Sequence, residues 1–173
     1  QSSEPMTSYS APTWLPGGHL QTIYAVLFAP VPRVAYRRTR WETPDGDFID
    51  LDWVETSPAS REPSTANAPL LVLFHGLEGG SRSHYARALM HAAAGRGWRG
   101  VVVHFRGCSG EENRLARAYH SGDSAEIDWI LRRLAQAEGA HSLFTVGVSL
   151  GGNALLKWLG EAGAAAQAIV HKA

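Results

Sequence analysis

The chain has 173 residues, of which 45% are hydrophobic, and equal numbers of acidic and basic side chains give a formal net charge of zero. This length supports one globular core, and a neutral balance without a basic stripe argues against nucleic acid as a partner. No run of 18 or more apolar residues predicts a transmembrane helix. The single cysteine, Cys108, has no partner for an internal disulfide, which favours a reducing, cytoplasmic location.

The first 34 residues are rich in proline, glycine and serine with interspersed aromatic side chains, which predicts an arm at residues 1–34. An apolar run at 23–29 is too short to span a bilayer, so we expect it to pack on the core. A weak contact with a membrane surface is the alternative for this run.

Two alternating stretches around Pro44-Asp45-Gly46 then predict a β-hairpin at residues 35–54, because Asp-Gly is a strong hairpin signal. In its second strand Asp50 and Asp52 share a face with Phe48 and Val54, so that face is apolar only in part. A polar stretch with proline and alanine follows and predicts a loop at residues 55–69.

From residue 70 to 173 the pattern alternates between short apolar runs and helical stripes. Runs at 70–74, 101–105 and 143–146 predict strands buried on both faces, and a further strand is expected to begin at 168–170. Helical spacing of apolar residues lies between these runs, at 85–93, 127–135 and 150–159. The alternation predicts a mostly parallel sheet with helices on both faces.

Gly147-Val148-Ser149-Leu150-Gly151 has the pattern G-x-S-x-G, directly after a predicted strand and before a predicted helix. In such a turn the serine backbone is strained, and glycines are needed where the flanking backbone approaches closely. The turn lifts the hydroxyl above the sheet edge and points a helix N-terminus at the reacting centre. Ser149 is therefore the candidate nucleophile, with a serine in an unrelated tight turn as the alternative.

The loop after the first core strand reads His75-Gly76-Leu77-Glu78-Gly79-Gly80. In this architecture that loop supplies one backbone N–H to the oxyanion, and the residue after the nucleophile supplies the other. The candidates are Leu77 and Leu150. His75 and Gly76 are expected to line the site, with His75 as a structural ring rather than the base. The loop lacks the Gly-Lys-Ser/Thr ending and the G-x-G-x-x-G spacing of nucleotide-binding loops.

Two further segments, 104–110 and 119–123, follow or precede core elements at the edge where ligands bind in parallel sheets. His120 is expected to line the site, whereas Asp123 is expected to cap the next helix together with Glu126. Cys108 has no neighbours that would activate a thiol. The eight histidines show no metal-binding spacing, so neither a metal nor another cofactor is expected.

Several blocks together resemble the YheT-type branch of the α/β-hydrolases. They stand at 14–22, 45–53, 75–79, 104–110, 119–123 and 147–153. The resemblance implies an α/β-hydrolase fold, of which the chain holds the N-terminal half, preceded by the arm and the hairpin. It also implies a serine hydrolase acting on small-molecule esters with medium or long acyl chains, or on lipid esters.

On that pattern Ser149 is the nucleophile, and Leu77 and Leu150 form the oxyanion hole. The triad aspartate and histidine are expected beyond residue 173, because the only acid after the serine is Glu161, which makes His171 a poor candidate base. Two alternatives stay open: an acyltransferase that uses the same site, and a truncated relative without catalysis that acts as a binding or scaffold protein.

Overall fold

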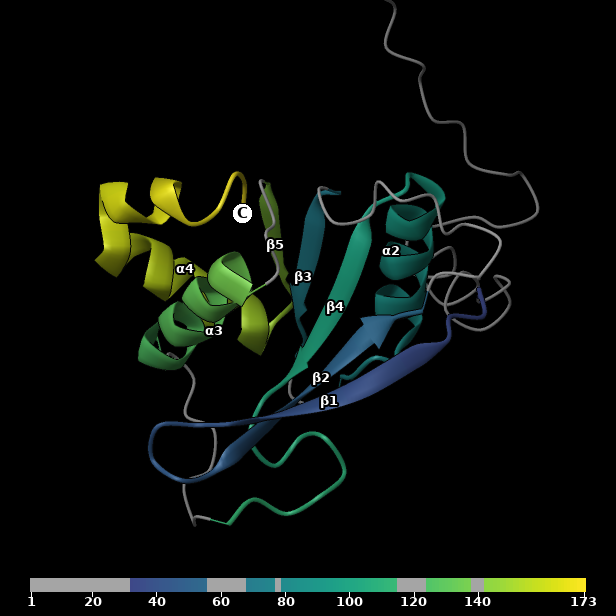
Figure 1. Ribbon diagram of the computed structural model, residues 1–173, viewed down its shortest axis with the longest axis horizontal. Helices are drawn as coiled ribbons and strands as arrows, with labels where there is room; N and C mark the ends of the chain where they lie inside the picture. The colour runs from purple at the N-terminus through teal and green to yellow at the C-terminus, as the bar shows by residue number, and fades with distance from the viewer. Residues whose placement is uncertain (1–31, 56–67, 77–78, 115–123, 138–141) are drawn as a thin grey trace, which may run out of the picture. The chain divides into compact units, whose positions relative to one another are not determined.

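The computed structural model describes residues 32–55, 68–76, 79–114, 124–137 and 142–173, which all belong to one compact unit, Pro32–Ala173. Figure 1 shows a central sheet with helices on both sides. The strands are β1 (Tyr36–Glu42), β2 (Phe48–Val54), β3 (Leu70–Phe74), β4 (Arg99–His104) and β5 (Leu143–Gly147). The helices are α2 (His84–Gly95), α3 (Ser124–Ala137), α4 (Leu150–Ala162) and the 3-10 helix η3 (Gly163–Ala168).

The five strands lie in the order β1-β2-β4-β3-β5. β3 pairs in parallel with both β4 and β5, as the buried apolar runs predict. The predicted hairpin is confirmed: β1 pairs antiparallel with β2, and β2 pairs antiparallel with β4. The described sheet is therefore mixed rather than mostly parallel as predicted, because the hairpin adds two antiparallel pairings to the two parallel ones.

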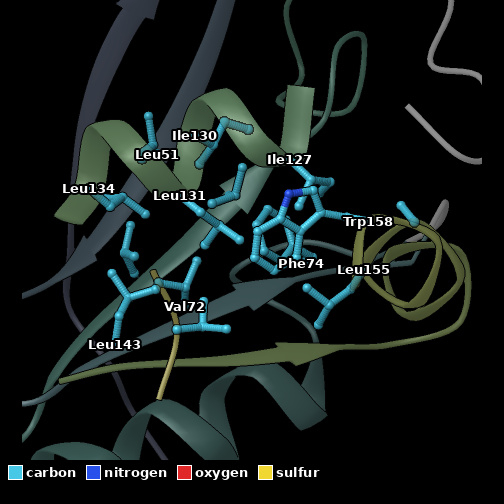
Figure 2. Close-up of a cluster of buried hydrophobic side chains, with 14 of the residues drawn as sticks. Leu51, Val72, Phe74, Ile127, Ile130, Leu131, Leu134, Leu143, Leu155 and Trp158 are labelled. Atoms are coloured by element: carbon cyan, nitrogen blue, oxygen red, sulfur yellow. The ribbon is translucent and has the colours of Figure 1, made fainter. Parts of the chain in front are cut away.

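Alternating side chains of the strands form two cores, one on each face of the sheet. One face packs against α3 and α4, and Figure 2 shows Val72 and Phe74 from β3 meeting Leu131 and Trp158 from these helices. The other face packs Leu71, Leu73 and Val102 against Ala86 and Met90 of α2. Since both faces are covered by helices, the carboxyl-terminal edge of the strands is left for the connecting loops.

The strand expected to begin at 168–170 is wrong. Gly163 adopts φ +53 and ends α4, and the chain continues as the 3-10 helix η3, in which the Ala166 carbonyl accepts hydrogen bonds from both Ile169 and Val170. The chain reaches the β5 edge only afterwards, as an isolated bridge between Phe144 and Lys172. The apolar run therefore closes a turn, and pairing with β5 starts later than predicted.

Three predicted features lie outside the described residues in whole or in part: the arm at 1–34, of which only 32–34 are described, the loop at 55–69, and the helix cap at Asp123. No helix in the described ranges has both the length and the apolar composition needed to cross a bilayer.

Candidate active site

Ser149 occupies the sharp turn between β5, which ends at Gly147, and α4, which begins at Leu150. Its backbone has φ 53 and ψ −114, and among the described residues no other non-glycine residue has a positive φ. A left-handed backbone is costly for a residue with a side chain and marks a site that the surrounding fold enforces. The side chain is exposed, so the turn presents the hydroxyl at the sheet edge.

Two glycines make this turn possible, as predicted. A Cβ on Gly147 would stand 2.5 Å from the Cα of Gly152, and a Cβ on Gly151 would overlap the carbonyl oxygen of Phe74. The Val148 N–H also donates to the Phe74 carbonyl, at 3.0 Å. The first turn of α4 is therefore held directly against the end of β3, and this contact fixes the orientation of Ser149.

Gly76 faces the serine from the loop after β3. A Cβ at Gly76 would lie 3.2 Å from the Ser149 Cβ and 3.7 Å from its Oγ. The Gly76 N–H donates to the hydroxyl of Tyr85 in α2, at 3.3 Å, so this helix helps to place the loop. Of the two predicted oxyanion donors, Leu150 is the first residue of α4, where an N–H has no intrahelical acceptor. Leu77 lies outside the described residues, as does His120.

His75 is fully buried at the end of β3, and its Nδ1 lies 2.5 Å from the Gly76 carbonyl oxygen, to which it donates. Burial, together with the nearby His104, lowers the pKa of His75 to about 4, although the Gly76 hydrogen bond acts in the opposite direction. The ring packs between His104 and Phe105. These contacts agree with the structural ring that we expect at this position.

Sequence reasoning missed a buried polar cluster around Asp52 of β2. The carboxylate, 3% exposed, accepts hydrogen bonds from Arg38 at 2.8 and 3.0 Å, from Ser81 at 2.5 Å and from His104 Nε2 at 2.8 Å. Burial alone would raise the pKa of Asp52, but the hydrogen bonds from these three partners outweigh it and lower the pKa well below its usual range. The hairpin register, which places Arg38 opposite Asp52, is the signal that could have found this pair.

Cys108 is partly buried, and burial raises the pKa of its thiol, which disfavours the reactive thiolate. No group of three or more potential metal ligands occurs within the ranges that the structure describes. In those same ranges no hydrogen bond joins a histidine to Ser149 Oγ. The rings of His75 and His104 are instead held by Gly76 and Asp52.

Comparisons with known proteins show which family has this fold and sequence. A family model described as "alpha/beta hydrolase fold" matches residues 69–172. The chain is 48% identical to the putative esterase YheT of Escherichia coli over 84% of this chain and 41% of that protein. It is 28% identical to the human phospholipase ABHD3 over 90% of this chain and 38% of that protein. The chain thus spans about two fifths of the length of these relatives.

Among solved structures, an esterase from Pyrococcus furiosus, Pf2001, superimposes with a TM-score of 0.57 at 16% identity. The superposition covers 74% of this chain and 47% of that one. At this identity the likeness concerns the fold alone, and it confirms the fold class predicted from the sequence.

Proposed function

Because the chain belongs to the alpha/beta hydrolase fold family, in its YheT-type branch, we propose that it supplies the nucleophile half of an enzyme that hydrolyses carboxylic esters. The observation that carries the proposal is the strained, exposed Ser149 between β5 and α4. A serine with φ 53 is retained only where the fold enforces it, and strain of this kind gathers at functional sites.

In the proposed reaction the Ser149 Oγ forms a bond to the ester carbonyl carbon while its proton passes to a base. The negative charge that develops on the carbonyl oxygen is held by the N–H groups of Leu150 and Leu77. Collapse of this intermediate breaks the bond to the alcohol, which leaves with the proton, and water then releases the acid from the acyl-serine.

The base and its carboxylate partner are proposed to come from the portion of the protein that lies beyond Ala173. Support comes from the described histidines of the site, since His75 and His104 use their rings to hold Gly76 and Asp52. The relatives are also more than twice as long as the stretch that they share with this chain.

The proposed substrates are small-molecule esters with medium or long acyl chains, or lipid esters. The name of the relative ABHD3, a phospholipase, supports a lipid ester. A weak contact with a membrane surface would fit such a substrate and belongs to the same proposal.

Labelling of the full-length protein with a fluorophosphonate probe tests the nucleophile. We expect mass spectrometry to locate the label on Ser149, and Ser149→Ala to lose both the label and at least about 99.9% of the hydrolysis of a p-nitrophenyl ester of a medium-chain acid. Ser142→Ala is the matched control, because Ser142 stands just before β5 whereas Ser149 follows it.

Full hydrolysis by a folded Ser149→Ala protein would sink the proposal. Adding an alcohol acceptor separates the two reactions that this site supports. A hydrolase releases mainly the free acid, whereas an acyltransferase releases mainly the new ester.

A further inference from the structure

The loop between β3 and α2 contacts the serine turn near its beginning and a buried carboxylate near its end. Gly76 lies against Ser149, so that a Cβ on this glycine would stand 3.2 Å from the Cβ of the serine. Ser81 is buried further along the loop, and its hydroxyl donates to Asp52 Oδ2 at 2.5 Å. Asp52 belongs to β2, which β4 separates from β3 in the sheet. The loop beside the nucleophile is therefore tied to a strand that is not a neighbour of β3.

A second route joins Asp52 to the beginning of the same loop through two histidine rings. His104 Nε2 donates to Asp52 Oδ2 at 2.8 Å, which fixes the His104 ring. This ring packs against the ring of His75, with 5.1 Å between the centroids, and its Cε1 would lie 3.4 Å from a Cβ on Gly80. His75 Nδ1 in turn donates to the Gly76 carbonyl at 2.5 Å. One carboxylate thus acts on both ends of the loop.

The Gly76 carbonyl is the point at which these contacts reach the proposed oxyanion donor. This oxygen accepts hydrogen bonds from His75 Nδ1 and from the Gly79 N–H, the latter at 2.9 Å. It belongs to the same peptide group as the N–H of Leu77. Because a peptide group is planar, hydrogen bonds that fix the carbonyl also fix the plane in which that N–H lies.

Asp52 is suited to this task because it is charged and accepts several hydrogen bonds at once. Arg38, which lies opposite Asp52 in the hairpin register, donates to both carboxylate oxygens at 2.8 and 3.0 Å. Burial would raise the pKa of Asp52, but the hydrogen bonds from His104, Arg38 and Ser81 lower it well below its usual range. The group is therefore a carboxylate at neutral pH, with only acceptor atoms facing its three partners.

We propose that Asp52 is a positioning residue of the esterase reaction, which holds the oxyanion donor after Gly76 in place through Ser81 and the rings of His104 and His75. The inference rests on the proposed function and adds to it a residue that does not touch the substrate. An oxyanion donor stabilises the transition state more than the bound ester. Loss of its positioning therefore lowers kcat and leaves KM nearly unchanged.

Asp52→Asn in the full-length protein tests the proposal, with the p-nitrophenyl ester of a medium-chain acid as substrate. The amide has one acceptor oxygen and turns an NH₂ group toward partners that are themselves donors. Removing an oxyanion donor costs about 10²–10³ in kcat, so we expect its displacement to lower kcat at least about tenfold, with KM changed by less than about twofold. Inhibition by a trifluoromethyl ketone, whose adduct with the serine carries an oxyanion, is expected to weaken by a similar factor.

Asp50→Asn is the matched control. Asp50 lies two residues earlier on β2, is also buried, and accepts two hydrogen bonds from Arg40 at 2.8 Å. Within the described ranges no hydrogen bond joins its side chain to the loop between β3 and α2. Both variants remove the charge of a buried carboxylate that is paired with an arginine, so both are expected to lower the melting temperature. Only Asp52→Asn is expected to lower kcat.

Ser81→Ala provides a milder variant, because it removes one hydrogen bond and leaves Asp52 with Arg38 and His104. We expect kcat to fall severalfold at unchanged KM, and this variant decides the question if Asp52→Asn does not fold. An unchanged kcat in the variant that decides, an equal fall of kcat in Asp50→Asn, or an effect confined to KM would overturn the proposal. The wild-type protein separates this failure from that of the proposed function, since hydrolysis that does not depend on Ser149 would overturn both.

Discussion

The backbone of Ser149 has a positive φ that is unfavourable for a residue with a side chain, and the close packing of Gly147 and Gly151 enforces it. The turn is so tight that the chain on either side of the serine touches itself and the end of β3. Any side chain larger than hydrogen at Gly147 or Gly151 would separate these segments. The position of the serine hydroxyl is therefore decided by residues that carry no chemistry themselves.

Gly151→Ala tests this dependence, because its Cβ would overlap the carbonyl oxygen of Phe74. We expect the free energy of unfolding to fall by at least about 2 kcal/mol. Gly160→Ala is the matched control on the same helix, where nothing lies within 4 Å of the added Cβ. That change is expected to stabilise the protein by up to about 1 kcal/mol. Urea unfolding of the full-length protein measures both, and equal stabilities would contradict the argument.

Residues of the serine turn could be predicted from the sequence, because the G-x-S-x-G pattern, a strand and a helix specify one local geometry. The polar cluster around Asp52 could not be predicted from the sequence. An aspartate in an alternating strand is typical of a solvent-facing position, and its burial depends on Ser81 and His104, which lie far away in the chain. Pairing of that kind follows from the sheet order, which residue patterns alone do not give.

Among the elements, the strands and helices of the core follow the predicted alternation, and the exception is informative. Residues 168–170 have the apolar character of a strand, but a strand needs a neighbour with which to pair. The positive φ of Gly163 and the small side chains after it favour a 3-10 turn, and hydrogen bonding to β5 begins only at His171 and Lys172. The apolar composition of a segment predicts that it is buried, whereas the local backbone conformation decides whether it forms a strand or a 3-10 turn.

The elements are also joined by charge, most clearly at Arg106 in the loop after β4. Its guanidinium donates to Glu126 of α3 at 2.7 Å and to Asp45 in the β1–β2 turn at 2.8 and 3.1 Å, and it lies 3.4 Å from Asp47. Burial would lower the pKa of Arg106, but hydrogen bonds to Asp45 and Glu126 outweigh it and raise the pKa. The arginine thus links the hairpin, the sheet and a helix.

Arg106→Met is expected to destabilise the protein by about 3–5 kcal/mol, because it removes one member of a buried ion pair, the guanidinium that donates to Glu126 at 2.7 Å. Arg132→Met is the matched control, since its partner Asp128 lies one turn away on the surface of α3. That exposed pair contributes little to stability. Chemical denaturation of the two variants gives the comparison, and similar losses in both would show that Arg106 does not link the elements.

For the described unit as a whole, the sheet has a helical layer on each face, and the loops that join strands to helices lie at the carboxyl ends of the parallel strands. His75 lies at this junction, beneath the loop that contacts Ser149, and it is neutral in the folded protein at neutral pH because burial lowers its pKa to about 4. An unfolded chain would bind a proton at this ring already near pH 6.5. The folded state therefore binds fewer protons than the unfolded state between these two values.

Stability should accordingly fall as the pH drops from about 6.5 to about 4, with His75 alone accounting for about 3 kcal/mol across this window. The sign follows because the unfolded state takes up the proton first, so acid favours unfolding. The carboxylates with lowered pKa, such as Asp52, add a further loss only below about pH 4.

Urea unfolding at several pH values separates these two pH windows. His75→Gln should remove the decline above pH 4, whereas His91→Gln, at an exposed position of α2, should keep it. An unchanged decline in folded His75→Gln would show that another group takes up this proton.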